Sequence, residues 1–82
     1  DGYNDTWKIR NIEFYPKNTI KIYNANSQLV KSLGEPTQPG GYKGDWDGKA
    51  ENGGKLPNGV YYYVIDLNDG SAIVKGFLTI LN

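Results

Sequence analysis

The side chains able to do chemistry in this chain of 82 residues are carboxylates, amides and hydroxyls, because it contains no His and no Cys. The usual general base and the most reactive nucleophile are therefore missing, which excludes a serine triad. Asp45 and Asp47 form a candidate carboxylate pair, but they flank a tryptophan within one turn and leave little room for a substrate cleft. We predict that the chain is not an enzyme.

Oxygen-rich segments are the remaining candidates for a metal site, and the ion they would suit is calcium. One comprises Asp1, Asn4 and Asp5, and the other comprises Asp45, Asp47, Glu51 and Asn52. Neither has the ligand spacing of an EF-hand loop, and Asp and Asn commonly serve turns. We predict that no metal and no other cofactor is bound.

The stretch Asp45-Trp46-Asp47-Gly48 and the run Val60–Leu67 organise the rest of the chain. Gly48 can adopt the positive φ that ends a turn, which leaves Trp46 free to point into the core. Val60–Leu67 is an unbroken apolar and aromatic run, which predicts a central strand with both faces covered. Tyr61 either bonds through its hydroxyl to upstream backbone, as in a tyrosine corner, or simply packs.

Short strands and turns are predicted elsewhere along the chain. Alternation predicts a first strand over Thr6–Arg10 and a break near Arg10-Asn11. Thr19–Asn24 and Gln28–Leu33 read as a hairpin with Leu29 and Leu33 on one face, and Ala72–Leu81 as the last strand. We predict an all-β fold, an immunoglobulin-like antiparallel β-sandwich of about six or seven strands, forming one small domain over residues 1–82.

Charge and hydropathy limit the partners of this domain. Nine basic and nine acidic side chains cancel and are interspersed, so no field attracts nucleic acid or an anionic membrane surface. The chain lacks an apolar stretch long enough to span a bilayer and lacks a signal peptide. Because it begins at Asp1 rather than Met, we read it as a piece of a longer protein, and we expect a monomer in isolation.

Several motifs, taken in order, resemble one known family. They are Asp1-Gly2-x-Asn4-Asp5-Thr6-Trp7, Tyr15-Pro16-x-Asn18, Ile22-Tyr23-Asn24, Trp46-Asp47-Gly48, Asn52-Gly53, Leu56-Pro57-x-Gly59-x-Tyr61-Tyr62-Tyr63 and Gly76-Phe77-Leu78-Thr79-Ile80. The set resembles the gliding-motility-associated C-terminal domain, the type B sorting domain of the type IX secretion system of Bacteroidota. The likeness covers nearly the whole chain.

The resemblance implies a C-terminal address that carries a cargo such as an adhesin through the periplasm and across the outer membrane, for release or attachment at the cell surface. The implied partners are the type IX translocon and an outer-membrane protein of the PorP/SprF family. The family-motif residues that would serve structure or recognition are Asp1, Gly2, Asn4, Asp5, Trp46, Asp47, Gly48, Leu56, Pro57, Gly59, Tyr61 and Tyr63. Lys75 and Phe77, predicted to face outward on the last strand, form a candidate docking face.

One segment departs from the type B pattern. Asn24-Ala25-Asn26-Ser27 stands where the family typically has Asn-Arg-Trp-Gly, and Lys31 stands where an aromatic is expected. Ile22-Tyr23-Asn24 with Gln28-Leu29-Val30-Lys31 is closer to the type A domains, which are generally cleaved. The sequence leaves type A and type B handling both open.

A carbohydrate-binding module is the alternative from another functional class, because small sandwiches rich in Tyr and Trp often bind glycans. Such a module would expose two or three rings in one plane. The candidate rings are Tyr3, Trp7, Tyr42, Tyr61 and Tyr63. A sorting domain can bury most of them.

Overall fold

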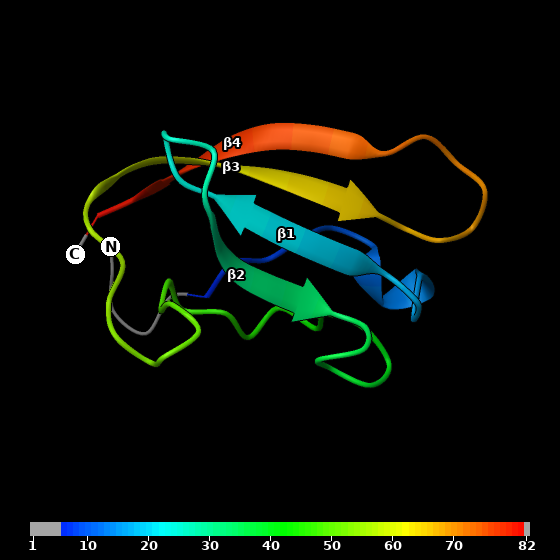
Figure 1. Ribbon diagram of the computed structural model, residues 1–82. Coiled ribbons are helices and arrows are strands. Elements are labelled where there is room, and N and C mark those ends of the chain that lie inside the picture. Colours follow the sequence, from blue (N-terminus) through cyan, green and yellow to red (C-terminus); the bar gives the residue numbers. More distant parts are fainter. Residues whose placement is uncertain (1–5, 82) are drawn as a thin grey trace.

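The computed structural model describes residues 6–81 and contains one antiparallel sheet of four strands in the order β2-β1-β3-β4 (Figure 1). The strands are β1 (Thr19–Tyr23), β2 (Leu29–Gly34), β3 (Gly59–Asp66) and β4 (Val74–Ile80). A short 3₁₀ helix, η1 (Ile12–Phe14), precedes β1. No α-helix occurs in the described part of the chain, so no helix there is suited to crossing a membrane.

The β1–β2 hairpin is closed by a side chain that satisfies turn backbone. The Asn24 Oδ1 atom accepts hydrogen bonds from the amides of Asn26, at 2.9 Å, and Gln28, at 3.0 Å. Ser27 takes the left-handed conformation with φ 63°, which the tight turn requires. The predicted hairpin is confirmed.

A bulge in β2 changes which of its side chains face the core. Ile22 pairs with Lys31, whereas the next residue of β1, Tyr23, pairs with Leu29, so Val30 is the extra residue. Leu33 is buried at 3% exposure and Leu29 is 51% exposed. The prediction that Leu29 and Leu33 share a face is wrong, because the extra residue reverses the alternation between them.

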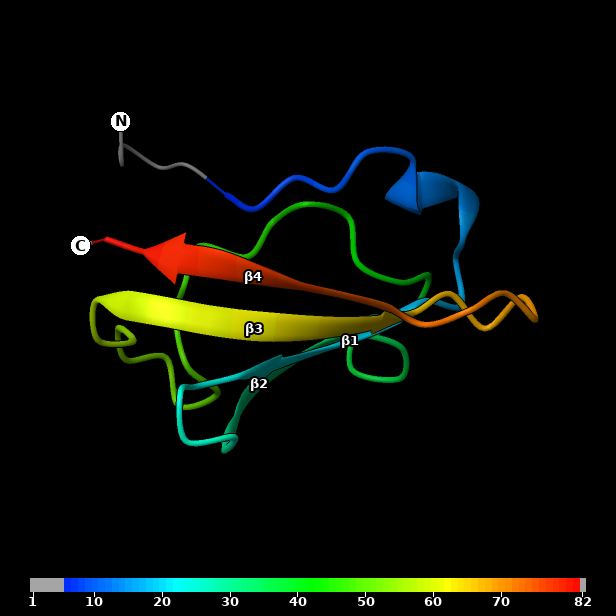
Figure 2. The same ribbon diagram turned by 90° about the horizontal axis from the view of Figure 1, so that it is seen from above.

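The core lies on one face of the sheet, called here the inner face. Ile20 and Ile22 of β1 are completely buried there. They belong to a cluster of buried side chains formed by Ile12, Ile20, Ile22, Leu33, Tyr42, Trp46, Leu56, Tyr61, Ile65 and Ile80. The cover over this face comes from residues 6–18 and the connection 35–58, which run beside the sheet without strands of their own (Figure 2, blue and green).

The second layer is therefore irregular, which corrects the predicted sandwich. The all-β antiparallel class is confirmed, but residues 6–81 hold four strands in one sheet rather than six or seven in two. The predicted strand Thr6–Arg10 is wrong, although the break is present because Asn11 has φ 66° before η1. The connection bends at several glycines with positive φ, so it does not form a straight strand with which residues 6–10 could pair. These glycines are Gly40, Gly41, Gly44 and Gly48.

The opposite face of the sheet, called here the outer face, is not covered by the described chain. Val60 of β3 is 56% exposed and Phe77 of β4 is 76% exposed. The prediction that the central strand has both faces covered is wrong, because a chain this short supplies one covering layer only. Half of the side chains of β3 therefore face solvent or a partner.

A buried amide fixes the end of the sheet where β1 begins. Asn18 is completely buried, its Oδ1 atom accepts from the Tyr42 amide at 2.9 Å, and its Nδ2 atom donates to the Tyr15 carbonyl at 2.9 Å. A Cβ atom at Gly34 would lie 2.3 Å from the Asn18 carbonyl oxygen, and one at Gly41 would lie 2.5 Å from its Nδ2 atom. Only glycine fits at either position.

Candidate functional site

The Trp-Asp-Gly motif builds the core rather than an exposed site. Trp46 is 6% exposed, and its indole nitrogen donates to the Lys49 carbonyl at 2.8 Å. Gly48 has φ 91°, as the turn requires, while the Asp47 carboxylate lies 3.4 Å from the Lys49 ammonium. The prediction that Trp46 plugs the core is confirmed.

The Leu-Pro-x-Gly-x-Tyr motif also has a structural role. The Tyr61 hydroxyl donates to the Pro57 carbonyl at 2.7 Å, four residues upstream, which is the hydrogen bond of a tyrosine corner. Leu56 is buried beside it, and Gly59 begins β3 at φ 154°. The hydrogen-bonded alternative for Tyr61 is the correct one.

Tyr63 and Trp7 hold the N-terminal segment against the sheet. Their ring centroids lie 5.0 Å apart, and the Tyr63 ring covers Gly76, where a Cβ atom would lie 2.3 Å from the Tyr63 hydroxyl oxygen. The Trp7 ring also meets Trp46 edge-on at 6.1 Å. Glycine at position 76 is what admits the Tyr63 ring.

A buried tyrosine hydroxyl, which the sequence did not single out, joins the same two segments. The Tyr42 hydroxyl donates to the Trp7 carbonyl and accepts from the Trp46 amide at 3.1 Å. Tyr42 is completely buried, and this burial raises the pKa of its phenol to about 12. Tyr42 therefore fixes residues 6–10 to the connection although no ladder joins them.

The oxygen-rich candidates do not come together. The carboxylates of the second segment are engaged separately: Asp45 accepts from Gln38 at 3.2 Å, and Glu51 accepts from the Ser32 amide at 2.7 Å. Within residues 6–81 no three acidic side chains gather in a way that could hold a metal ion. Asp1, Gly2, Asn4 and Asp5 lie outside the described residues.

Two open hollows of about 270 Å³ each are present in the described structure. One lies against the Trp46 turn and β2, and the other lies beside Pro57 at the start of β3. Both are smaller than most ligand pockets, and no charged side chain lines the second one. Charged side chains of both signs line the first one, and two of them, Asp47 and Lys49, form an ion pair with each other.

The outer face carries a continuous row of large side chains, of which Leu29 and Phe77 are exposed and Tyr23 and Tyr62 are half-buried. Cross-strand pairing aligns Leu29 with Tyr23, Tyr23 with Tyr62, and Tyr62 with Phe77, so the row spans all four strands. The Tyr23 and Tyr62 rings stack at 5.6 Å, and Phe77 meets Tyr62 edge-on at 6.3 Å. We call Leu29, Tyr23, Tyr62 and Phe77 the aromatic row.

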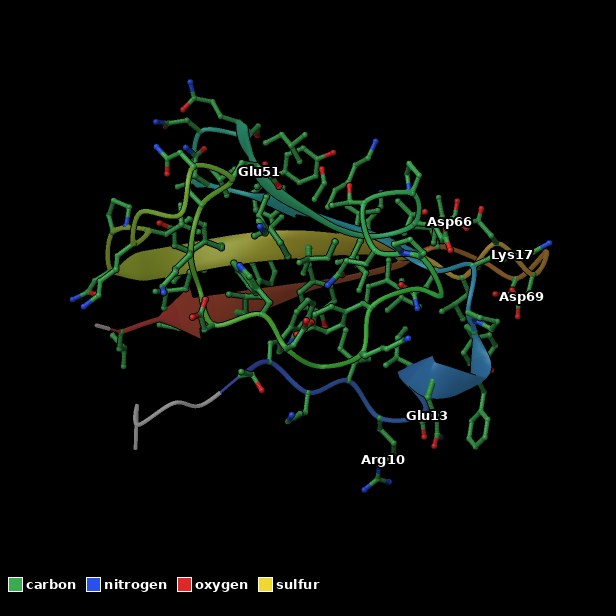
Figure 3. All side chains as sticks on the ribbon, turned by 90° about the horizontal axis from the view of Figure 1, so that it is seen from below. Arg10, Glu13, Lys17, Glu51, Asp66 and Asp69 are labelled. Carbon is green, nitrogen blue, oxygen red and sulfur yellow. The ribbon has the colours of Figure 1, made fainter. Side chains whose placement is uncertain are left out.

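Lysines border the aromatic row on one side. Lys21 and Lys75 both pair with Val64, one from each neighbouring strand, and both are exposed. Neither forms an ion pair with another described residue. The acidic side chains Asp66 and Asp69 lie instead at the end of the sheet, near Lys17 (Figure 3). Lys75 and Phe77, predicted as a docking face, thus lie side by side on an exposed surface.

The rings considered for glycan binding are placed differently. Tyr42 and Tyr61 are buried, Trp7 and Tyr63 are half-buried, and Tyr3 lies outside the described residues. The half-buried Tyr23 and Tyr62 rings of the aromatic row stack on each other, so their faces are not laid flat for a sugar. This arrangement does not provide the planar platform of a carbohydrate-binding module.

The described residues define a small all-β domain whose motif residues build the core and whose exposed apolar side chains gather on one sheet face. The family model of the CHU_C type IX secretion signal domain matches residues 1–80, and the chain belongs to this family. No curated protein and no solved structure shows significant similarity to it. The chain is therefore a signal domain of type IX secretion, which serves export to the cell surface or the extracellular space.

Proposed function

We propose that the type IX machinery reads this domain in its folded form, through the outer face of the sheet. The observation that carries the proposal is the aromatic row, because it places Leu29 and Phe77, 51% and 76% exposed, at the two ends of one apolar band. Exposed apolar bands on small domains are typical of protein-binding surfaces. Lys21 and Lys75 would add charge contacts at the border of the band.

The finer steps of export are part of the same proposal. Residues 1–82 form a single sorting domain at the C-terminal end of a larger cargo, which travels through the periplasm and is then released or attached at the surface. The receptor is a translocon component, with an outer-membrane protein of the PorP/SprF family as the expected partner. The domain itself performs no catalysis and is monomeric in isolation.

The resemblance leaves two modes of handling after export, and the hairpin that distinguishes them lies next to the proposed surface. The Ser27 and Tyr62 hydroxyls are hydrogen-bonded, so the Asn24–Ser27 turn rests on the aromatic row. A receptor that contacts the row would therefore also meet this turn. Retention of the domain on the exported cargo would support type B handling, and its removal would support type A.

A reporter fused to residues 1–82, expressed in cells with type IX machinery, tests the proposal. Phe77→Ser should leave the domain folded, because the side chain is 76% exposed, and should reduce export at least about tenfold. The matched control is Phe14→Ser, since Phe14 is 70% exposed but lies on η1. Equal export of the Phe77→Ser and Phe14→Ser fusions would refute the outer-face proposal.

The lysine border is tested in the same assay. Lys75→Glu should lower export, whereas Lys55→Glu, an exposed change in the connection, should not. Folding of each variant is checked by thermal denaturation. Normal export of a folded Lys75→Glu fusion would remove the charge contacts from the proposal.

A further inference from the structure

The two edge strands of the sheet differ in whether side chains bond to their outward backbone groups. β2 and β4 are the edge strands. The β2 edge is closed by side chains: the Ser32 amide donates to Glu51 Oε1 at 2.7 Å, and the Gly34 amide donates to Gln38 Oε1 at 2.8 Å. Glu51 can be seen beside β2 in Figure 3. An edge closed in this way cannot pair with another chain.

These bonds also show which backbone groups face which neighbour. Amide and carbonyl groups alternate in direction along a strand, so the outward amides of Ser32 and Gly34 mean that Leu33 faces β1. The bond from the Glu35 amide to the Asn18 carbonyl, at 2.8 Å, agrees with this alternation. Ile20, the partner of Leu33, therefore faces β2.

The same alternation continues across the sheet to β4. Because Ile20 faces β2, its neighbour Lys21 faces β3, where it pairs with Val64. Tyr63 and Ile65 must then face β4, where they pair with Gly76 and Val74. The backbone groups of Lys75, Phe77 and Thr79 are left pointing away from the sheet.

The β4 edge is open within the described structure. No residue from 6 to 81 is bonded to the outward backbone groups of Lys75, Phe77 and Thr79. All three side chains are exposed. A seven-residue strand with free amides and carbonyls is a template for a further strand.

We propose that the β4 edge accepts an extended segment of a partner protein, which adds a fifth strand to the sheet by pairing with Lys75, Phe77 and Thr79. The aromatic row ends at Phe77, so the added strand would continue this row with an apolar side chain. A carboxylate on the added strand, two residues from that apolar side chain, would lie opposite Lys75. The inference rests on the proposed function, and the partner is a component of the export machinery that offers such a segment.

Charge favours a different protein over a second copy of this chain. β4 reads Val-Lys-Gly-Phe-Leu-Thr-Ile and contains no acidic residue. Two copies paired through β4 would each present a lysine and neither would supply a carboxylate. A partner strand with Asp or Glu two residues away from an apolar residue satisfies both features of the edge, because residues two apart share a face of the sheet.

Proline substitution tests the edge directly. Thr79→Pro removes an amide hydrogen that points away from β3, which an edge strand tolerates, whereas Thr79→Val keeps the amide as a matched control. In the reporter fusion to residues 1–82, Thr79→Pro should lower export about tenfold, and Thr79→Val should export as the unchanged fusion does. Lys75→Pro compared with Lys75→Val repeats the test at the other end of β4.

The possible outcomes distinguish edge pairing with a partner protein, self-association and failure of the proposed function. A folded proline variant that exports as well as its valine control overturns the edge pairing, and the outer-face proposal then depends on the Phe77→Ser result alone. Unfolding at both positions also overturns it, because the two amides would then be bonded within the domain. Concentration-dependent dimers lost in Thr79→Pro would assign the edge to a second copy. Failure of the unchanged fusion to be exported would instead contradict the proposed function.

Discussion

Replacing Tyr42 by Phe removes the two hydrogen bonds through which its hydroxyl joins Trp7 to Trp46, and it leaves the bond from the Trp7 amide to the Trp46 carbonyl in place. The change keeps the ring in the core but removes the hydroxyl between the Trp7 carbonyl and the Trp46 amide. A buried polar group left without a partner costs about 1–3 kcal/mol. Because two such groups are left, we expect the free energy of unfolding to fall by about 2–6 kcal/mol.

Urea denaturation followed by tryptophan fluorescence measures this loss, since Trp7 and Trp46 both lie beside Tyr42. The matched control is Tyr23→Phe, a half-buried tyrosine on the outer face, which should change stability by less than about 0.5 kcal/mol. Equal stability of the Tyr42→Phe and Tyr23→Phe variants would refute the joining role of Tyr42.

The same tyrosine predicts how stability changes at alkaline pH. Burial raises the pKa of Tyr42 from 10.0 to about 12, so the unfolded chain loses this proton first. Its contribution to stability is complete below pH 10 and is lost as pH rises toward about 12. The unchanged domain should therefore lose more stability over this range than Tyr42→Phe does, and parallel losses would contradict the assignment.

Three further outcomes follow from buried and turn residues. Asn18→Leu should lower stability by about 1–3 kcal/mol in thermal denaturation, because the Tyr42 amide loses its partner while the Tyr15 carbonyl keeps its bond from the residue 18 amide, and an unchanged melting temperature would contradict this. Trp46→Ala should cost about 3–5 kcal/mol, and in a Trp7→Phe background the Trp46 emission should be blue-shifted, whereas a red-shifted, quenchable emission would contradict its burial. Hydrogen bonds from Ser71 lower the pKa of Asp69, so Ser71→Ala should raise its NMR titration midpoint, and an unmoved midpoint would refute this cause.

Local motifs were predictable from the sequence because their contacts are close in the chain. The Trp46 turn depends on Gly48, and the Tyr61 hydroxyl reaches a carbonyl only four residues upstream. The hairpin was predictable for the same reason, since Asn24 satisfies amides within its own turn. Such contacts are encoded by residue type and spacing.

Features that depend on distant segments could not be predicted in this way. The hydroxyl bond from Tyr42 joins residues 35 positions apart, and nothing in the local sequence indicates it. Thr6–Arg10 has the alternation of a strand, but a strand also needs a partner that bonds along its length. The glycine-rich connection accepts one backbone bond, from the Trp7 amide to the Trp46 carbonyl, and forms no ladder. The bulge at Val30 moved Leu29 from the core to the surface without any Gly or Pro to mark it.

The aromatic row could be predicted only in part from the sequence. Alternation alone placed Lys75 and Phe77 on one side of the last strand. The full aromatic row required the register of all four strands, since Leu29, Tyr23 and Tyr62 become neighbours of Phe77 only through cross-strand pairing.

The most direct test of a folded signal is to unfold the domain without changing its last strand. Ile20 of β1 is completely buried, so Ile20→Asp places an unpaired charge in the core and leaves Val74–Ile80 intact in sequence. The control, Lys17→Asp, introduces the same residue at an exposed position of the preceding turn. With the reporter fused to residues 1–82, we expect export with Lys17→Asp and none with Ile20→Asp. Normal export of the unfolded Ile20→Asp fusion would show that a linear segment carries the signal and would contradict recognition of the folded surface.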